Sequence, residues 1–288
     1  MDFSNIKCIV ISGGGSMLYQ MLGILYQLIK SKKINIDNIS HFYGSSSGAI
    51  LSLVLSLGIE IDTLNKYFIE RPWDKLIKTD IFHILHSFTS CGVISKEFII
   101  SALEPLYKSK DIDIDCTMSK LYEVTKKEIH IIATNITDGI CEDISYKTHP
   151  DWSVIDAIHA SICIPTIVEP LIKDNKCYVD GCVVTHFPIK HALDIFDKNE
   201  IIGIKTKNIT RTLNKDVKFN NVLEFLYYMI EHTHHNFISQ SSDISDISNI
   251  FIISRSSYDM VDIFNVINSK DKRLEYFNEG KIIYADSI

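Results

Sequence analysis

The first 60 residues of the chain repeat one pattern, an apolar run followed by a glycine-rich turn and a helical segment. Residues 6–12, IKCIVIS, are rich in β-branched side chains and predict a buried strand that leads into GGGS. The next segment has apolar residues at helical spacing: Met17, Met21, Ile24, Leu25 and Leu28. A second predicted strand, residues 39–43, leads into GSSSG and a predicted helix over residues 49–57. Strand, tight turn and helix in this order are typical of an α/β protein with a parallel sheet.

The rest of the chain predicts further strands and a hairpin. Strands are predicted at residues 128–135, 141–147, 201–207 and 249–254. Two apolar runs, IVEPLIK and KCYVD, flank Asp174-Asn175 and predict the hairpin.

Helices are predicted over most of residues 60–125, at SVIDAIHAS, near residues 217–237 and in the tail. The one low-complexity tract, residues 239–249, is too short to separate domains. We therefore expect residues 1–288 to form a single domain, with the core motifs in about residues 6–207 and C-terminal helices to residue 288.

Composition and charge exclude several classes of protein. Hydrophobic residues make up 46% and charged residues 23% of the chain, which suits a globular protein with a sizeable core. The net charge of −7, without a basic stripe, predicts no nucleic-acid binding. Contact with a membrane would therefore use apolar surface instead of a polybasic patch. The longest apolar run, residues 49–59, is too short to span a bilayer.

The seven cysteines are scattered and contain no CxxC pair, which argues against a disulfide framework or a zinc site. Reduced thiols are typical of a cytoplasmic protein. The N-terminal residues MDFSNIKCIVIS lead directly into the first predicted strand, so no signal peptide is predicted.

The stretch GSSSG, residues 44–48, has the composition of a flexible linker but also matches Gly-x-Ser-x-Gly, which mounts a nucleophilic serine on a tight turn. A linker is normally bounded by polar sequence, whereas GSSSG lies between an apolar strand and an apolar helix. The turn places Ser46 at its tip as the candidate nucleophile. Gly44 and Gly48 are then required, because side chains there would collide with the strand and the helix.

The glycine triplet Gly13, Gly14 and Gly15 also joins a predicted strand to a predicted helix. Backbone N–H groups at such a turn can bind an anion. A nucleotide-phosphate loop is disfavoured, because no Lys-Ser/Thr pair follows and the dinucleotide fingerprint is broken. Beside an elbow serine, the triplet and Ser16 fit an oxyanion hole, in which their N–H groups and that of Ser47 would stabilise a tetrahedral oxyanion.

A nucleophilic serine needs a base. Asp180 followed by His232, His234 or His235 supplies the Ser–Asp–His order of a catalytic triad. The ordinary α/β-hydrolase arrangement, however, builds several strands before its nucleophile, and Ser46 follows only two. The three histidines also lie in a predicted amphipathic helix, which favours solvated or packed side chains.

Four motifs in this order, GGGSMLYQMLGIL, GSSSGA, ASICIPTIVEP and DGCVVTHFP, resemble the patatin-like phospholipase family. The resemblance covers about residues 6–207, and the tail LEYFNEGKIIYAD is also similar. It implies a three-layer α/β/α fold with a mainly parallel central sheet, and an acyl hydrolase with a Ser–Asp dyad and no catalytic histidine. By this resemblance Ser46 is the nucleophile, Asp180 in the motif with Gly181 is its partner, and the glycine triplet forms the oxyanion hole.

The dyad makes a chemical demand on Asp180. An ordinary aspartate, with a pKa of about 3.9, is a poor base toward a serine hydroxyl. Desolvation raises that pKa, and Asp180 follows the apolar run KCYV, where such an environment is expected. Taken alone, Asp-Gly is a common turn, so the catalytic assignment of Asp180 depends on the resemblance.

The chain departs from the family pattern at several positions. A basic residue and a glycine usually follow the glycine triplet, and Met17 and Leu18 stand there instead. The loss of that cation bears on how an anionic head group or the loop itself is held. Asp-Gly-Gly is Asp-Gly-Cys here, with Cys182 in third place, and His186 replaces an asparagine. We expect a structural role for His186 and for Ser161 in ASICIP.

The sequence therefore predicts a serine lipid acyl hydrolase of the phospholipase A or lysophospholipase type that needs no metal or cofactor. Its expected partner is a membrane lipid or phospholipid, reached from the cytoplasm through peripheral membrane contact. Phe82, Leu85 and Phe88 are expected to form a lipid-facing lip. Two alternatives stay open: a catalytically impaired lipid- or protein-binding relative, favoured by the missing basic residue, and a nucleotide-binding protein that uses GGGS.

Overall fold

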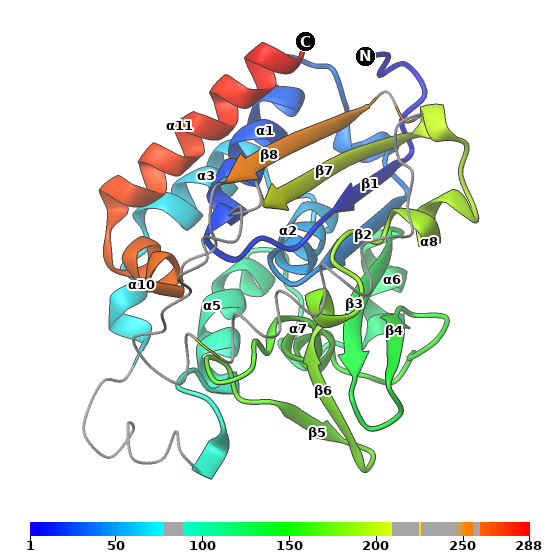
Figure 1. Cartoon of the computed structure of the whole chain (residues 1–288). Helices are drawn as coiled ribbons and strands as arrows, with labels where there is room; N and C mark the ends of the chain where they lie inside the picture. The colour runs from blue at the N-terminus through cyan, green and yellow to red at the C-terminus, as the bar shows by residue number, and fades with distance from the viewer. Residues whose placement is uncertain (78–88, 209–224, 226–246, 248, 256–259) are drawn as a thin grey trace, which may run out of the picture.

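All strands in the described part of the chain belong to one sheet. The computed structural model describes residues 1–77, 89–208, 225, 247, 249–255 and 260–288 (Figure 1). Five parallel strands form its centre and one side: β1 (Cys8–Ile11), β2 (His41–Ser45), β3 (Glu128–Asn135), β7 (Ile201–Asn208) and β8 (Ile250–Arg255). Three strands that pair in antiparallel fashion complete it: β4 (Ile140–Ile144) and β6 (Lys176–Asp180), which pair with β3, and β5 (Leu171–Lys173), which pairs with β6. The order is β5-β6-β3-β2-β1-β7-β8, with β4 paired to β3.

Two strands differ from their predicted bounds for identifiable reasons. The strand predicted at residues 39–43 lies two residues later, because β2 pairs with β3 as far as Ser45, opposite Ile132. The strand predicted at residues 141–147 ends at Ile144, where the Ser145 N–H donates to Thr148 Oγ1 (2.9 Å) at the start of a turn. The predicted hairpin is confirmed as β5 and β6.

Alternate side chains of the strands pack into two separate hydrophobic cores. In β1, Ile9 and Ile11 belong to the larger core, whereas Cys8 and Val10 belong to a smaller core on the opposite face, as the two-residue period of a strand requires. The helix α8 (Ile189–Leu193) contributes Ile189 to the smaller core. The predicted α/β fold, with helices on both sides of a mainly parallel sheet, is therefore confirmed.

The larger core takes buried side chains from most of the helices. These helices are α1 (Leu18–Lys30), α2 (Ser47–Ser56), α3 (Ile61–Glu70), α5 (Lys96–Lys108), α6 (Met118–Thr125), α7 (Val154–Ile162), α10 (Met260–Asn268) and α11 (Lys270–Ser287). Short 3-10 helices are η1 (Gly15–Met17), η2 (Ile36–Asn38), η3 (Trp73–Leu76), η4 (Gly181–Val183) and η5 (Lys198–Glu200). The helical periodicity predicted after GGGS is confirmed in α1, whose apolar face is buried.

The last helix, α11, lies along α1 at a very short distance (Figure 1). A Cβ atom on Gly280 would lie 2.0 Å from the Gln20 carbonyl oxygen, and one on Gly23 would lie 2.2 Å from that of Phe277. The buried Arg273 guanidinium donates to four backbone carbonyls, those of Ile69, Arg71, Val266 and Ile267. Close backbone approach and this arginine together fix the C-terminal helix to the domain.

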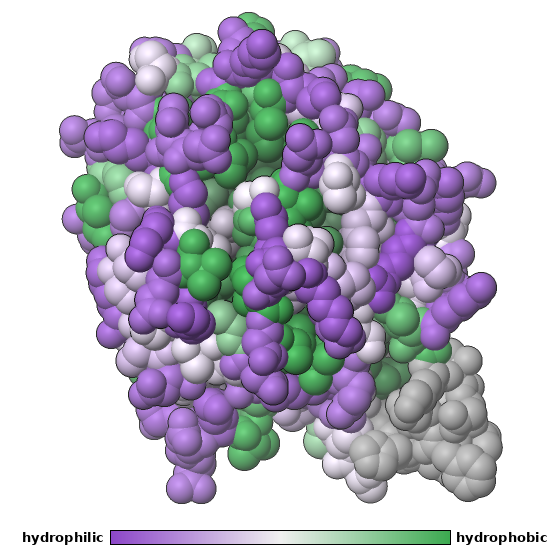
Figure 2. Space-filling model, turned by 180° about the vertical axis from the view of Figure 1, so that it is seen from behind, coloured by the Kyte–Doolittle hydropathy of each residue, from purple (hydrophilic) through white to green (hydrophobic). Residues whose placement is uncertain are grey.

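Several predicted features fall outside the described residues. They are the helix near residues 217–237 with its three histidines, most of the tract at residues 239–249, and the lip residues Phe82, Leu85 and Phe88. Within the described ranges, no helix combines the length and the apolar character needed to cross a bilayer. On the face opposite to that of Figure 1, hydrophobic side chains reach the surface in several groups bordered by hydrophilic ones (Figure 2).

The α1–α11 contact gives a stability prediction. Gly280→Ala should lower the free energy of unfolding by about 2 kcal/mol or more, because the new methyl group has no space beside Gln20. Alanine is a better helix former than glycine, so helix propensity alone predicts that this substitution raises the free energy of unfolding. Urea unfolding measures the change, with Asn278→Ala on the exposed side of α11 as the control. Equal or higher stability of Gly280→Ala would contradict the close contact.

Candidate active site

Ser46 occupies a strained turn between β2 and α2. Its backbone has φ 54° and ψ −124°, a conformation that residues other than glycine rarely adopt. A Cβ atom on Gly48 would lie 2.3 Å from the Ile11 carbonyl oxygen, and one on Gly44 would lie 2.4 Å from the Gly48 carbonyl oxygen. GSSSG is thus a tightly packed turn that holds Ser46 between the strand and the helix.

The Ser46 hydroxyl donates a hydrogen bond to the Asp180 carboxylate, with Oγ 2.6 Å from Oδ2. Asp180 is the last residue of β6, and its N–H donates to the Cys163 carbonyl (3.0 Å). Its own carbonyl accepts from Thr134 Oγ1 (3.0 Å) on β3. Because β6 and β2 both pair with β3, the sheet brings together two residues that are 134 positions apart.

A second serine, Ser161, holds the backbone of the turn. The Ser46 N–H donates to Ser161 Oγ (2.9 Å), and the Ser161 hydroxyl donates to the Ile132 carbonyl on β3 (2.6 Å). Ser161 lies on α7 and is fully buried. These two bonds tie the backbone of the nucleophile candidate to α7 and β3, in line with the structural role expected for Ser161.

The Asp180 carboxyl is buried in surroundings that disfavour its charge. Only 3% of the residue is exposed, and this burial raises the pKa of Asp180 to about 6. Hydrogen bonds from the Ser46 hydroxyl and the Cys182 N–H (2.8 Å to Oδ1) act in the opposite direction, since they favour the charged form. The result is a carboxylate that is still ionised at neutral pH and is more basic than an ordinary aspartate.

The glycine triplet lies directly against this pair. A Cβ atom on Gly13 would lie 3.2 Å from Ser46 Cβ and 2.0 Å from Cys182 Sγ. The Gly13 N–H already donates to the His186 carbonyl (3.0 Å). Gly14 and Gly15 stand at the start of the 3-10 helix that contains the buried Ser16, where N–H groups have no acceptor within the helix.

Ser47 supplies a further backbone N–H beside the nucleophile candidate. It is the first residue of α2, and the first N–H groups of a helix have no acceptor within that helix. The positive end of the α2 dipole also points toward the turn. Gly14, Gly15 and Ser47 thus each carry a backbone N–H at the start of a helical segment.

His186 contacts the glycine triplet. Its Nε2 lies 3.0 Å from Thr206 Oγ1, and the Thr206 hydroxyl donates to the Gly13 carbonyl (2.6 Å). Since the His186 carbonyl also accepts from Gly13, this residue holds the loop at two points. These contacts fit the structural role expected for His186.

Cys182 is a site residue for which sequence reasoning gave no role. Its Sγ lies over Gly13 and 3.6 Å from Ser45 Oγ. Burial raises the pKa of the Cys182 thiol, which therefore stays neutral beside Asp180. The only signal of this in the sequence was that Cys182 stands where the Asp-Gly-Gly motif has its second glycine. Gly181 cannot carry a side chain, because a Cβ atom there would lie 2.2 Å from the Ile132 carbonyl oxygen.

Met17 and Leu18, which replace the family's basic residue and glycine, point into the core. Met17 is fully buried and Leu18 is 8% exposed. Both pack within the larger hydrophobic core. This end of the glycine loop is therefore anchored by apolar packing. The site as a whole is a serine on a strained strand-to-helix turn that is hydrogen-bonded to a buried aspartate on a mainly parallel sheet.

Comparisons with known proteins agree with this class of site. Residues 9–193 match the family model described as patatin-like phospholipase. The "Probable lipid hydrolase 463L" of Invertebrate iridescent virus 6 is 31% identical over 227 residues, 75% of this chain and 76% of that protein. The "Uncharacterized protein R571" of Acanthamoeba polyphaga mimivirus is 27% identical over 227 residues, 77% of this chain and 74% of that protein.

The family match extends over the glycine triplet, Ser46 and Asp180. The chain therefore belongs to the patatin-like phospholipase family. Among solved structures, VipD from Legionella pneumophila has a TM-score of 0.52 at 15% identity, covering 95% of this chain and 67% of that one. At this identity the likeness concerns the fold alone.

The raised pKa of Asp180 gives a stability prediction with a definite sign. Between about pH 4 and pH 6 the folded protein holds a proton on Asp180 that the unfolded chain has lost, so this group lowers stability as the pH rises. Asp180→Asn should therefore be more stable than wild type at pH 7, by up to about 3 kcal/mol, and the gain should vanish near pH 4.

Asp156→Asn is the matched control with the opposite sign. Asp156 is buried but pairs with Lys96 and with Lys173 (3.0 Å), and these partners lower its pKa despite the burial. Its stabilising effect is present above about pH 4 and is lost below that, so Asp156→Asn should destabilise the protein at pH 7. Thermal melts at both pH values measure the difference. A Tm of Asp180→Asn below wild type at pH 7 would contradict the assignment.

Proposed function

We propose that the chain is a serine lipid acyl hydrolase of the phospholipase A or lysophospholipase type, which cleaves fatty-acyl esters with Ser46 and Asp180. The observation that carries this proposal is the 2.6 Å hydrogen bond from a serine on a strained turn to an aspartate with a pKa of about 6. A base whose pKa lies near the working pH is ionised and still accepts a proton effectively. Membership of the family and the viral relative described as a probable lipid hydrolase support the substrate class.

In the first step Ser46 Oγ attacks the carbonyl carbon of the ester, and Asp180 Oδ2 takes the hydroxyl proton. The negative charge that develops on the carbonyl oxygen is stabilised by the N–H groups of Gly14, Gly15 and Ser47. The Ser46 backbone, held by Ser161, keeps Oγ in place while the bond forms. Collapse of the tetrahedral intermediate expels the alcohol, which receives the proton from Asp180, and leaves the fatty acid bound to Ser46 as an ester.

In the second step water hydrolyses this ester. Asp180, ionised again, accepts a proton from the water, which attacks the acyl carbon. The same N–H groups stabilise the second oxyanion. The fatty acid leaves, and Ser46 regains its proton from Asp180. A side chain with the pKa of Asp180 can act as base and acid in turn, so the cycle needs no histidine.

The lipid substrate implies contact with a membrane surface. We propose a cytoplasmic protein that associates peripherally, through apolar surface, because the net charge of −7 disfavours electrostatic attraction to anionic lipids.

The second candidate function is a catalytically impaired lipid- or protein-binding member of the family. The observation that favours it is the buried, apolar Met17-Leu18 pair, where the family usually has a cation that could assist an anionic head group. The contacts of Ser46 and Asp180 favour catalysis. An activity-directed probe distinguishes the two candidates.

Removal of either residue of the pair should abolish activity. Ser46→Ala and Asp180→Asn should each lower kcat/KM for a phospholipid or a short-chain ester by at least about 1,000-fold, because the two groups act as a unit. A fluorophosphonate probe should label wild type and leave Ser46→Ala unlabelled. Ser52→Ala, which changes a buried serine on the helix that follows Ser46, is the control and should keep wild-type activity and labelling. A wild-type protein that neither labels nor hydrolyses would favour the impaired relative.

The pKa of Asp180 sets the pH dependence. Because the carboxyl must be ionised to accept the proton, kcat/KM should fall roughly tenfold per pH unit below about pH 6 and level off above it. A soluble short-chain ester keeps interfacial binding out of the measurement. An apparent pKa near 7 in this profile that changes in His232→Ala, His234→Ala or His235→Ala would instead support a catalytic triad with a histidine.

A further inference from the structure

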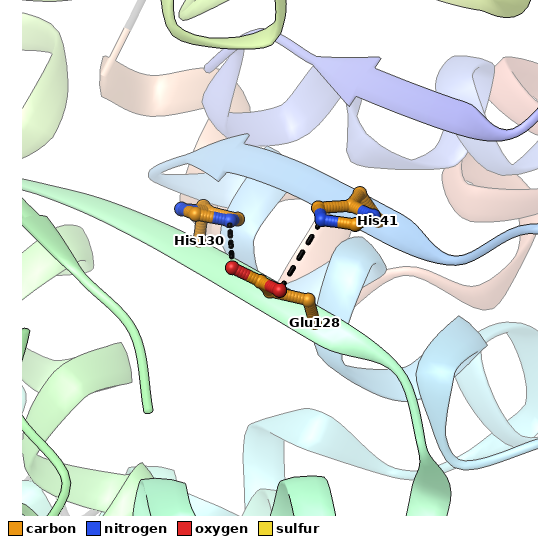
Figure 3. A group of neighbouring side chains, drawn as sticks. All are labelled: His41, Glu128 and His130. Carbon is orange, nitrogen blue, oxygen red and sulfur yellow. Dashed lines mark ion pairs between the residues drawn. The ribbon is translucent and has the colours of Figure 1, made fainter. Parts of the chain in front are cut away.

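Three side chains gather at the end of the sheet opposite to Ser46. His41 and Glu128 are the first residues of β2 and β3, and they are direct neighbours in the parallel register. His130 lies two residues further along β3, so its side chain is on the same face as that of Glu128. Figure 3 shows both imidazoles directed toward the Glu128 carboxylate.

Their ligand atoms lie close enough together to share one metal ion. His41 Nε2 lies 3.2 Å from Glu128 Oε2, and His130 Nε2 lies 3.2 Å from Glu128 Oε1. One ligand atom from each residue lies within 4.8 Å of the other two. Zinc bonds of 2.0–2.1 Å at tetrahedral angles separate neighbouring ligand atoms by roughly 3.3 Å.

Each imidazole is held through its other nitrogen. His130 Nδ1 lies 2.8 Å from Asp143 Oδ2, and His41 Nδ1 lies 2.9 Å from Ser40 Oγ. A carboxylate on the far nitrogen of a histidine fixes the tautomer and the ring orientation, and it is the usual outer partner of a metal-bound histidine. Ring packing adds to this: Tyr43 stacks on His130 at 4.0 Å, and Phe196 meets His41 edge-on at 4.8 Å.

The cluster contains a buried ligand atom without a hydrogen bond. His130 is 6% exposed, and its Nε2 has no hydrogen-bond partner among the described residues although Glu128 Oε1 is 3.2 Å away. Such an atom is costly to bury unless a further partner uses it.

We propose that His41, Glu128 and His130 bind one Zn²⁺ ion, with water completing its coordination. Two imidazoles and one carboxylate suit zinc better than magnesium or calcium, which prefer oxygen ligands. From His41 to Ser46 the chain advances five residues along β2, roughly 16 Å at 3.3 Å per residue. The ion would therefore join the starts of β2 and β3 and would take no part in ester cleavage, so this inference is independent of the proposed function.

Lys147 competes for the same carboxylate. Its Nζ lies 2.7 Å from Glu128 Oε1, and its side chain is 55% exposed. An exposed lysine can move into water when a divalent cation replaces its charge. The proposal therefore predicts tighter metal binding when Lys147 is removed, whereas a network of ion pairs alone predicts only lost stability.

The test uses Co²⁺, whose visible absorption bands distinguish tetrahedral from octahedral coordination. The full chain, freed of any histidine tag and treated with EDTA, should bind one equivalent of Co²⁺ in a tetrahedral site and exchange it for Zn²⁺. Glu128→Gln and His130→Gln should weaken binding by at least about 100-fold, and Asp143→Asn by about tenfold. Lys147→Ala should strengthen Co²⁺ binding. It should also enlarge the increase in Tm that added Zn²⁺ produces.

The control is His149→Gln. His149 lies 3.2 Å from Glu142, so this pair resembles one half of the cluster without a second imidazole. This variant should bind Co²⁺ as wild type does, and so should Ser46→Ala. Absence of a tetrahedral spectrum in wild type would overturn the proposal, as would binding that survives Glu128→Gln or is unchanged in Lys147→Ala. The lysine variant alters an exposed side chain, so its result does not depend on a perturbed core.

Discussion

The close backbone approach around Ser46 is the constraint on which the rest of the site depends. Gly48 packs against the carbonyls of Ile11 and Ser12, and Gly13 packs against Cys182 and Ser46, at distances that leave no room for a side chain. The end of β1, the glycine loop, the turn and the start of α2 are therefore held as one rigid unit. Rigidity of this kind keeps a non-glycine residue at φ 54° and directs its hydroxyl out of the turn.

The sheet topology then supplies the partner of Ser46. β6 runs antiparallel beside β3, and its last residue, Asp180, pairs with Ala133, which follows the residue of β3 that pairs with Ser45 at the end of β2. The carboxyl lies in a desolvated position and accepts two hydrogen bonds, which together leave its pKa near neutrality. Three nearby residues, Ser161, Thr134 and His186, position the backbone of the site through hydrogen bonds. Burial of the ionised Asp180 carboxylate lowers the stability of the folded protein, and such perturbed groups are common at functional sites.

The two ends of β2 and β3 carry different chemistry. The ends that point toward α2 hold the serine and the backbone donors, whereas the starts of the strands hold His41, Glu128 and His130 on the face of the smaller core. Helix packing on that face is thin among the described residues, where α8 is the helix that contributes to it. A metal ion at this position would supply cross-linking where apolar packing supplies little.

The sequence by itself determined the alternation of strands and helices, the turn at GSSSG and, through the ordered motifs, the family. These depend on local periodicity and on glycines that no other residue can replace, so neighbouring residues suffice to read them. Strand ends were less predictable, since the bounds of β2 follow from its pairing with β3. Tertiary structure alone decided that the Gly13 N–H is taken by His186, that Cys182 lies over the glycine loop, and that His41 meets a pair of residues on another strand. Each joins segments distant in sequence, because only the register of the parallel strands and the chain path around them bring these atoms together.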